Sequence, residues 1–308
     1  MAGNSGQIPS IGRDIVGYSY TSEKAPRLAV EPGATVRFET WDARAGALLD
    51  REAGRPFGLP RPTPGRGNPL TGPLAVRGAQ PGDALLVTIE GIECISPGWC
   101  GGHAHVGPLP PGRVPRPRGR VCTHDGEFVH FAEDVQLPLA PMVGCIGTAV
   151  PDDPPNAGLP GRHGGNLDHP VVAAGAVVHL PVFVDGGLLY IGDVHATQGD
   201  GELSGIGLEI PAEVTVTVDI DRGRALRWPW VVNEERVIVM TSALEFADAR
   251  REAVEQIVRV LETQLGYEPA DALGLISIAG DLRIGQAFGG MEMTLRLEMP
   301  SSLGISPG

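Results

Sequence analysis

Short runs of alternating apolar and polar residues dominate the first three quarters of the chain, and they predict β-strands. ATVRFETWD (34–42) and EVTVTVDI (213–220) both alternate with the period of two that places one face of a strand against a core. PGDALLVTIEGIE (81–93) begins with a Pro-Gly-Asp turn signal and continues into a run rich in β-branched residues. These patterns indicate a body built mainly from β-strands.

The region around residue 185 predicts a β-hairpin. VVHLPVFV (177–184) and LLYIGDV (188–194) flank the tight-turn sequence Asp185-Gly186-Gly187. If the second of these strands is extended, Asp193 and His195 lie on the same face, because successive side chains of a strand alternate.

Helical periodicity is confined to the C-terminal quarter. Residues 242–266 carry one apolar stripe, a Ser242–Glu245 pair typical of a capping box, and Gly266 where the helix would end. A second, shorter helix is predicted over PADALGLIS, with Pro269 in its first turn. Two extended segments are predicted to close the chain: 277–285 and 291–299.

We therefore predict a mainly β (α+β) fold with two regions. Residues 1–235 would form a β-sandwich or barrel-like body that carries the polar site loops, and residues 236–308 a small helix-plus-strand region packed as part of the same unit. The 44 Gly and 29 Pro residues favour many short strands and turns. Residues 96–120, which are especially rich in Pro and Gly, are predicted to form a long irregular loop with a basic, solvated tail.

Charge and apolar runs narrow the class of partner. The net charge of −13 disfavours binding to nucleic acid or to an anionic membrane and suits a small neutral or cationic ligand. No apolar run approaches the roughly 18 residues of a membrane helix, and the N-terminus lacks a signal-peptide pattern. Four cysteines without a CxxC pair do not indicate a disulfide scaffold. We expect a soluble, cytoplasmic protein with reduced thiols.

The segment YIGDVHATQGDGELSG (190–205) gathers carboxylates, an imidazole and an amide without a basic residue: Asp193, His195, Gln198, Asp200 and Glu202. Two like charges about 4 Å apart repel by roughly 4 kcal/mol at an effective dielectric constant near 20. The carboxylates therefore either point apart into solvent or surround a cation. If the segment stays extended, Asp200 and Glu202 also share a face.

A second polar loop, HGGNLD (163–168), has a similar composition and shortly precedes the predicted hairpin. Carboxylates with one or two histidines suit Zn²⁺ or Mn²⁺, whereas an oxygen-only set suits Ca²⁺. An aspartate in a turn often only caps backbone amides, so turn chemistry stays an alternative to a metal site. His103 and His105 form another possible ligand pair, but they lie in the Gly/Pro-rich loop.

Covalent catalysis finds little support in the sequence. The GxSxG pattern occurs only as GISPG at the C-terminal end of the sequence, where no helix follows to build a nucleophile elbow. Cys100 lies near His103, but a cysteine is more often an inert small apolar residue.

The two polar loops resemble the acetamidase/formamidase family, whose members carry an HGGN-(L/M)-D segment and a GDxHxxQGDGE segment. The resemblance extends to four further stretches in the expected order: FETWDARAG (38–46), NPLTGPLAVRGAQPGDALLVTI (68–89), PLAPMVGCIGTA (138–149) and GDLRIGQ (280–286). It implies a β-rich hydrolase that releases ammonia from formamide, acetamide or similar short, neutral amides. It also implies a divalent metal, with zinc expected before calcium or manganese, and a homodimer or larger homo-oligomer.

The resemblance carries eight positions over to this chain: Asp42, Asn166, Asp168, Asp193, His195, Gln198, Asp200 and Glu202. Their division into roles is our own hypothesis. The expected metal ligands are Asp168, Asp193, His195 and Asp200. Glu202 would act as general base and then general acid, with Asp193 and Asp200 also in catalytic positions. Asn166, Gln198 and Asp42 would bind the substrate.

The chain also departs from the family pattern. Cys145 stands where an aliphatic residue is expected, and the GWCGGHAHVGPLPP loop (98–111) has no recognisable counterpart. Because loops shape pockets, these differences bear on the substrate more than on the reaction. Two alternatives therefore stay open: a non-catalytic β-rich protein with a structural calcium site, and a hydrolase of the same family that acts on a larger or cyclic amide.

Overall fold

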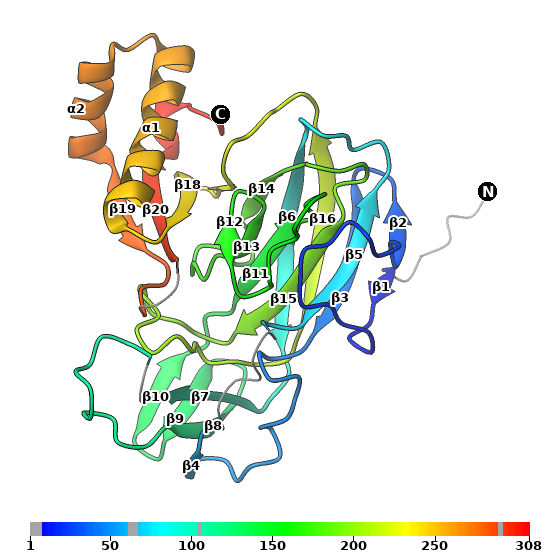
Figure 1. Ribbon diagram of the computed structural model, residues 1–308, viewed down its shortest axis with the longest axis vertical. Coiled ribbons are helices and arrows are strands. Elements are labelled where there is room, and N and C mark those ends of the chain that lie inside the picture. The colour runs from blue at the N-terminus through cyan, green and yellow to red at the C-terminus, as the bar shows by residue number, and fades with distance from the viewer. Residues whose placement is uncertain (1–7, 61–66, 104–105, 289–291) are drawn as a thin grey trace.

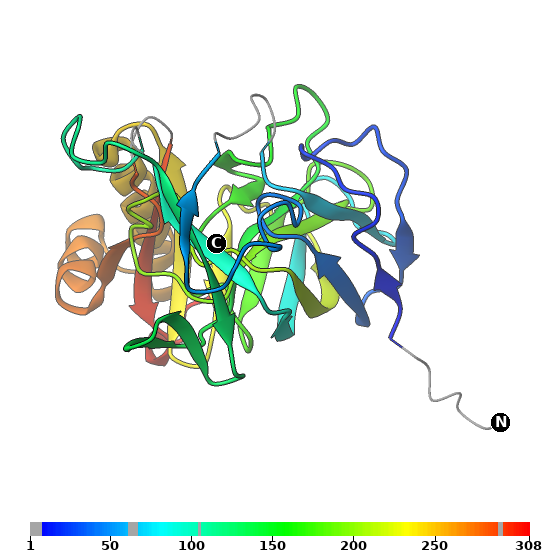
Figure 2. The ribbon, with the colours of Figure 1, turned by 90° about the horizontal axis from the view of Figure 1, so that it is seen from below.

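Strands arranged in three sheets make up most of the fold, as the mainly β prediction requires, and the only two α-helices among the described residues lie near the C-terminus. The computed structural model describes residues 8–60, 67–103, 106–288 and 292–308. In both views the helices lie on one side of the molecule and the first two strands on the opposite side (Figures 1 and 2). Neither large sheet closes into a barrel within this described part, so the body is an open sandwich.

The largest sheet has nine strands and is antiparallel except at the edge formed by its first two strands. In spatial order its strands are β1 (Ser10–Ile11), β3 (Ala34–Thr40), β16 (Ala212–Asp221), β6 (Ala84–Cys94), β14 (Val177–Pro181), β17 (Trp230–Val232), β18 (Arg236–Ala243), β20 (Met293–Pro300) and β19 (Asp281–Ile284).

The second sheet has six strands and carries most of the site residues. In spatial order its strands are β12 (Pro160–Gly161), β13 (Gly164–Asn166), β11 (Met142–Thr148), β15 (Leu189–His195), β5 (Leu70–Val76) and β2 (Leu28–Val30).

These two sheets pack face to face around the main hydrophobic core. Val36 and Phe38 of β3 are fully buried, and the alternation that predicted this strand places both of them in the core. Ile146 of β11 and Ile191 of β15 belong to the same cluster from the opposite sheet. Burial of apolar area between the sheets is the main stabilising term for such a sandwich.

The predicted hairpin at residue 185 is wrong. β14 pairs with β6 and β17 in the nine-stranded sheet, whereas β15 pairs with β11 and β5 in the six-stranded sheet. The turn at Gly186 and Gly187 therefore carries the chain from one sheet to the other. A turn signal marks a change of direction, but long-range pairing decides which strands become neighbours.

Residues 96–120 are more ordered than predicted. They supply β7 (Gly98–Gly102) and the start of β8 (Arg118–His124), which pair in a small third sheet. Trp99 is a core residue of this part, with only 1% of its surface exposed. The sheet also contains three further strands: β4 (Pro56–Gly58), β9 (Phe128–Ala132) and β10 (Val135–Pro138). His103 is described, but its predicted partner His105 lies outside the described residues.

The long helix begins four residues later than predicted. Strand β18 continues to Ala243 and uses Ser242 in pairing with β20, so α1 (Phe246–Leu265) starts after Glu245 and no capping box forms. The C-terminal prediction is confirmed: Gly266 has a left-handed backbone (φ 73°), and its N–H donates to the carbonyl of Glu262.

The second helix, α2 (Pro269–Ala279), begins with the predicted proline. It extends past Ser277, so only residues 281–284 of the predicted extended segment 277–285 form a strand. Helix α1 packs against β18 and β20 and helix α2 against β20, in a cluster that contains Ile257, Leu261 and Ile276. Because these strands extend the nine-stranded sheet, residues 236–308 share a sheet with the rest of the chain. A 3-10 turn follows at Ser301–Leu303.

Within the described part of the chain, neither helix combines the length with the apolar character that a bilayer crossing would require.

Candidate active site

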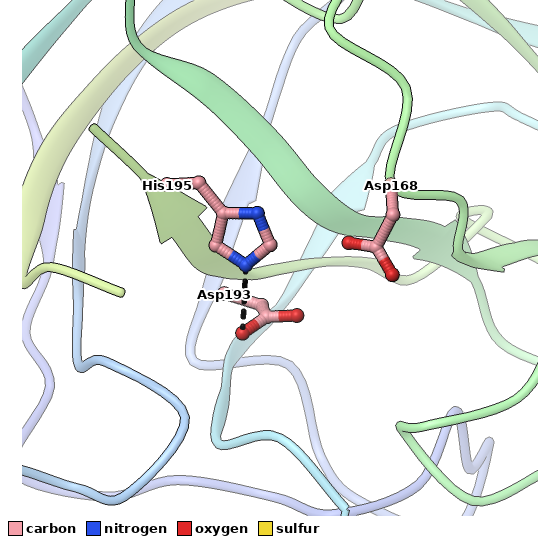
Figure 3. Close-up of side chains that lie close together, drawn as sticks. All are labelled: Asp168, Asp193 and His195. Atoms are coloured by element: carbon pink, nitrogen blue, oxygen red, sulfur yellow. Dashed lines mark ion pairs between the residues drawn. The ribbon is translucent and has the colours of Figure 1, made fainter. Parts of the chain in front are cut away.

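A cluster of buried acidic side chains surrounds one histidine at the end of the six-stranded sheet. Asp168, Asp193 and His195 present ligand-type atoms within 4.8 Å of one another, and Figure 3 shows the three side chains converging. Nε2 of His195 lies 3.7 Å from Oδ1 of Asp193 and 3.2 Å from Oε1 of Glu209. Glu202 and Glu209 form a second such group with the same histidine.

The sheet itself brings these groups together. Asp193 and His195 lie in β15, as the sequence predicted, and Asp168 follows β13. Strand β11 lies between these two strands and pairs with both, with Cys145 opposite Asn166 on one side and Gly192 on the other. The segment between β15 and β16 then returns Glu202 and Glu209 to the same place.

Gly144 of β11 leaves the space in which the two aspartates meet. A Cβ atom at this position would lie 2.5 Å from Oδ1 of Asp168 and 3.1 Å from Oδ2 of Asp193. Any larger residue would therefore displace both carboxylates. The glycine keeps open a small space surrounded by oxygen atoms.

Three of the site carboxylates sit on unusual backbone. Asp168 (φ 48°), Asp193 (φ 56°) and Glu202 (φ 38°) account for three of the six described non-glycine residues with positive φ. This conformation costs of order 1–3 kcal/mol for a non-glycine residue, and such strain gathers at functional sites. The left-handed turn at Asp193 also interrupts the simple alternation from which its shared face with His195 was predicted.

Gln198 fixes the orientation of the histidine. Its Nε2 donates to the carbonyl oxygens of Asp168 (2.7 Å) and Gly285 (3.3 Å), so its Oε1 must be the atom that lies 2.7 Å from Nδ1 of His195. Since Oε1 only accepts, Nδ1 carries the proton in the neutral ring. The lone pair on Nε2 is thereby directed towards the carboxylates.

Asparagine side chains hold the two aspartates. Nδ2 of Asn68 donates to Oδ2 of Asp193 and to Oδ1 of Asn166, the latter at 2.9 Å. Nδ2 of Asn166 in turn donates to Oδ2 of Asp168 at 2.5 Å. Gln286 completes the chain of contacts, because it accepts from Nδ2 of Asn166 (3.2 Å) and donates to its carbonyl (3.1 Å).

Burial and neighbouring charges shift the pKa values of four groups of the cluster: Asp168, Asp193, His195 and Glu202. Burial raises the pKa of Asp168, and the charge of Asp193 raises it further. The pKa of Glu202 rises for the same two reasons, burial first and Asp168 second. Burial alone would lower the pKa of His195, but the carboxylates of Glu209 and Asp193 outweigh it and raise that pKa. The cluster is thus short of positive charge.

The donor set suits a divalent cation. Oδ1 of Asp168 and Oδ1 of Asp193 are buried and have no hydrogen-bond partner among the described residues. These two oxygens, the directed Nε2 of His195 and the space beside Gly144 form a mixed nitrogen and oxygen set of the kind that holds zinc or manganese. The residues present therefore fit a metal, and the clustering goes beyond ordinary turn chemistry.

The cluster opens into a cavity of about 530 Å³. Asn166, Asp168, Asp193, Glu202 and Glu209 line one part of it. A small molecule that enters the cavity therefore reaches the carboxylates directly.

Asp200 does not join the cluster. Its two carboxylate oxygens accept from the guanidinium of Arg296 at 2.7 and 3.0 Å, and 35% of its side chain is exposed. The loop from Gly199 to Glu202 turns instead of remaining extended, so Glu202 points to the site while Asp200 points to strand β20. This ion pair corrects our expectation that Asp200 would be a metal ligand and a catalytic residue.

Asp42 is also occupied elsewhere. It is fully buried and accepts hydrogen bonds from the backbone N–H groups of Arg44 (2.9 Å) and Gly46 (2.7 Å) and from Nε1 of Trp99 (2.8 Å). It caps a turn and does not line the cavity. We therefore no longer assign Asp42 a substrate contact; its link to the site is Trp99, which does line the cavity.

Sequence reasoning missed three residues that matter here. Glu209 lies between Leu208 and Ile210, where the pattern indicates only a strand, although a carboxylate between apolar residues was a usable signal. Asn68 is the first residue of the NPLTGP stretch, and the sequence alone assigned it no role in the site. Arg296 lies far along the chain, so the sequence did not reveal that a basic residue from another strand pairs with Asp200.

The chain resembles known proteins along most of its length. The profile of the acetamidase/formamidase family matches residues 20–157 and 156–301. The crystal structure of an acetamidase from Bacillus halodurans is 32% identical, with a TM-score of 0.88 over 96% of this chain and 98% of that one. The structure of an acetamidase from Yersinia enterocolitica is 30% identical, with a TM-score of 0.86 over 97% and 94% of the two chains.

One curated relative matches over a shorter stretch. The acetamidase of Mycolicibacterium smegmatis is 28% identical over 218 residues, which cover 50% of this chain and 53% of that one. The chain therefore spans about half the length of this relative. The family profile covers far more than half of the chain, and on that ground the protein belongs to the acetamidase/formamidase family.

Proposed function

We propose that this protein is a metal-dependent amidohydrolase that converts short-chain amides such as formamide and acetamide into a carboxylate and ammonia. The observation that carries the proposal is the buried cluster of Asp168, Asp193, His195, Glu202 and Glu209, which opens into a cavity in a member of this family. An amide is a poor electrophile with a poor leaving group, so the site must activate the carbonyl and supply a proton to nitrogen.

Asp168, Asp193 and His195 would hold the metal, with Glu209 within reach of the same histidine. Zinc is our first expectation, and manganese or calcium are alternatives; calcium is the least suited, because it prefers an oxygen-only set. Such a cation supplies Lewis acidity towards the amide carbonyl when it is bound. Asp200 is left out of the proposed ligand set, because Arg296 engages both of its oxygens.

Glu202 is the proposed general base and general acid. Burial first and Asp168 second raise its pKa, and a raised pKa makes a carboxylate a better acceptor of a proton from water. It would accept the proton of the attacking water as the new C–O bond forms. It would then deliver that proton to nitrogen as the C–N bond breaks and ammonia leaves.

Asn166 is the proposed substrate contact among the amide side chains, because it lines the cavity next to Asp168. Gln198 does not line that cavity, and its amide is engaged by His195 and by two backbone carbonyls. We therefore assign Gln198 a positioning role towards His195 in place of the expected substrate contact.

We further propose a cytoplasmic homodimer or larger homo-oligomer. Exposed apolar side chains on α2 support self-association, since Leu273 and Ile278 are 50% and 84% exposed. Both statements stay predictions.

The test of the chemical proposal is the turnover of Glu202→Gln. The amide cannot take up a proton, so we expect ammonia release from acetamide to fall by roughly 10²- to 10⁴-fold. Metal content, measured by elemental analysis, should stay at the wild-type level. Glu255→Gln on the exposed face of α1 is the matched control and should keep wild-type turnover. Near-full activity of Glu202→Gln would exclude its acid–base role.

A further inference from the structure

We propose that the acyl side of this site takes an uncharged apolar group of about phenyl size, so that the preferred substrates are primary amides considerably larger than acetamide. The inference rests on the proposed amidohydrolase function and names its substrate class. It is carried by the size of the cavity and by the distribution of polar and apolar residues along its walls.

The cavity is much larger than a short amide needs. Its volume is about 530 Å³, which falls within the usual range of roughly 300–1,000 Å³ for sites that enclose small molecules. Acetamide has on the order of twice the bulk of a water molecule, whose share of liquid volume is about 30 Å³. It would occupy a small fraction of the space and touch few of the walls. Ligand sites normally bury most of the ligand surface, so the cavity fits a larger acyl group.

Part of the cavity wall is apolar. Leu48 and Trp99 belong to one buried core cluster, and the half-buried Ile206 packs against it. The hydrogen bond from Nε1 of Trp99 to Asp42 fixes the plane of the indole ring. A preformed apolar surface of this kind binds an apolar group without first having to be ordered.

Two further apolar residues extend this wall beside the loop that carries Glu202. A Cβ atom at Gly205 would lie 2.9 Å from side-chain carbons of both Val106 and Phe288, so these two side chains approach the loop backbone closely. Val106, Phe288 and Gly205 all line the cavity. The carboxylates thus share the cavity with a group of apolar side chains, and Tyr18, His103 and Asn156 also line it.

Charge decides between an apolar and an anionic acyl group. Arg44 also lines the cavity, and its guanidinium carbon lies 5.9 Å from the centre of the Trp99 ring. The carboxylates of Glu209 and Asp42 lie close enough to act on this guanidinium electrostatically. An anionic substituent would in addition meet the carboxylates that line the cavity. The arrangement therefore favours an uncharged group.

The test is a comparison of kcat/KM for acetamide, phenylacetamide and succinamic acid with the full chain, purified with zinc or manganese present. Burial of the phenyl group against the apolar wall should raise kcat/KM for phenylacetamide by roughly 10- to 100-fold over acetamide. Equal or lower values for phenylacetamide would overturn the inference. A preference for succinamic acid would also overturn it and would assign the far end of the cavity to Arg44.

Substitutions in one loop test whether the apolar residues of the cavity cause the preference for phenylacetamide. Ile206→Ala should lower kcat/KM for phenylacetamide about 10-fold and reduce its advantage over acetamide. Leu203→Ala is the matched control, because Leu203 is 57% exposed in the same loop and does not line this cavity. Equal effects of the two substitutions on phenylacetamide would contradict the assignment. Phe288→Ala is a second variant with the same expected loss, should Ile206→Ala fail to fold.

The two proposals can fail separately. Hydrolysis of acetamide without any preference for phenylacetamide would refute the apolar acyl site and leave the amidohydrolase function standing. Absence of turnover for all three amides by metal-loaded, folded protein would refute both.

Discussion

At the scale of single residues, the site depends on side chains that orient other side chains. Gln198 uses both ends of its amide. The nitrogen donates to two backbone carbonyls, and the oxygen accepts a hydrogen bond from Nδ1–H of His195. Without this contact the imidazole could rotate, and Nε2 would no longer be directed at Asp193 and Glu209. Partners of this kind commonly alter metal affinity by 10- to 100-fold.

We therefore predict that Gln198→Met weakens binding of Zn²⁺ by roughly 10- to 100-fold, because methionine fills the space but cannot accept the Nδ1 proton. Isothermal titration of the metal-free protein measures this directly and does not depend on activity. Thr197→Val changes the neighbouring side chain and should leave the affinity unchanged. Wild-type affinity in Gln198→Met would mean that His195 keeps its orientation without this partner.

His163, the first residue of the HGGNLD loop, predicts how stability changes with pH. It is 5% exposed, packs edge-on against Tyr20 at 4.6 Å between ring centres, and burial lowers its pKa to about 4. The unfolded chain, with a histidine pKa near 6.5, binds the proton more readily than the folded chain does. The folded state is therefore favoured fully above pH ~6.5, and this contribution is lost as pH falls towards 4.

Between pH 7.5 and pH 5, this single group should lower the free energy of unfolding by about 2 kcal/mol. His163→Phe keeps an aromatic ring and removes the titration, so its stability should fall less over this interval by that amount. Urea unfolding at the two pH values measures the difference. The same loss in the variant and in the wild type would show that His163 does not titrate in this way.

For single residues, some predictions from the sequence were right and others were wrong. Asp168, Asp193, His195 and Glu202 were predicted from the two polar motifs and do converge. Asp200 shares their motif but pairs with Arg296, which comes from a strand almost a hundred residues later. Spacing along the chain cannot reveal such a partner.

At the scale of elements, the C-terminal strands clamp the site loop in place. The N–H of Gly201 donates to the carbonyl of Ile284 (2.8 Å), and the N–H of Ala287 donates to the carbonyl of Gly201 (2.8 Å). Arg296 of β20 adds the two hydrogen bonds to Asp200 and is itself held by Glu298 at 2.6 Å. The loop that carries Glu202 is thereby fixed to the sheet from both sides.

We predict that Arg296→Met lowers the free energy of unfolding by about 3 kcal/mol, because Arg296 is only 4% exposed and its loss leaves buried charge unpaired. This value lies at the lower end of the range of about 3–5 kcal/mol for breaking a buried ion pair, because water can still reach Asp200. Displacement of Glu202 should also lower kcat by roughly 10- to 100-fold.

Arg283→Met is the matched control for the clamp. This arginine also approaches Asp200, at 3.6 Å, but its side chain is 49% exposed, so its removal should change stability by less than about 1 kcal/mol. Chemical unfolding and acetamide turnover of the two variants give the comparison. Equal effects of the two substitutions would contradict the clamp.

Elements also show what pattern alone could and could not predict. The alternation in residues 34–40 and 213–220 gave the correct strands and the correct buried faces. The Asp185-Gly186-Gly187 turn was real, but the strands on either side of it belong to different sheets. The capping signal at Ser242 was overridden because Ser242 pairs with Thr294 in β20, and α1 begins only after Glu245.

At the scale of the whole molecule, the sandwich explains how five acidic and imidazole side chains can be buried together. Strand β15 supplies Asp193 and His195, Asp168 follows the end of β13, and the nine-stranded sheet packs against these strands. The surrounding fold offsets the backbone strain at three positions and the repulsion among the carboxylates. A bound cation would reduce that repulsion. A mainly β sandwich was predictable from the sequence, and the family resemblance carried over the eight site positions.

The measurement that tests this account most directly is ammonia release from acetamide and phenylacetamide by the purified protein, before and after chelation and after return of one divalent metal. We predict that release stops on chelation and returns with zinc or manganese, while the chelated protein stays folded. Full turnover by protein shown to be metal-free would contradict the metal-dependent mechanism. Metal-dependent thermal stability without turnover of either amide would contradict the enzyme and leave a structural metal site.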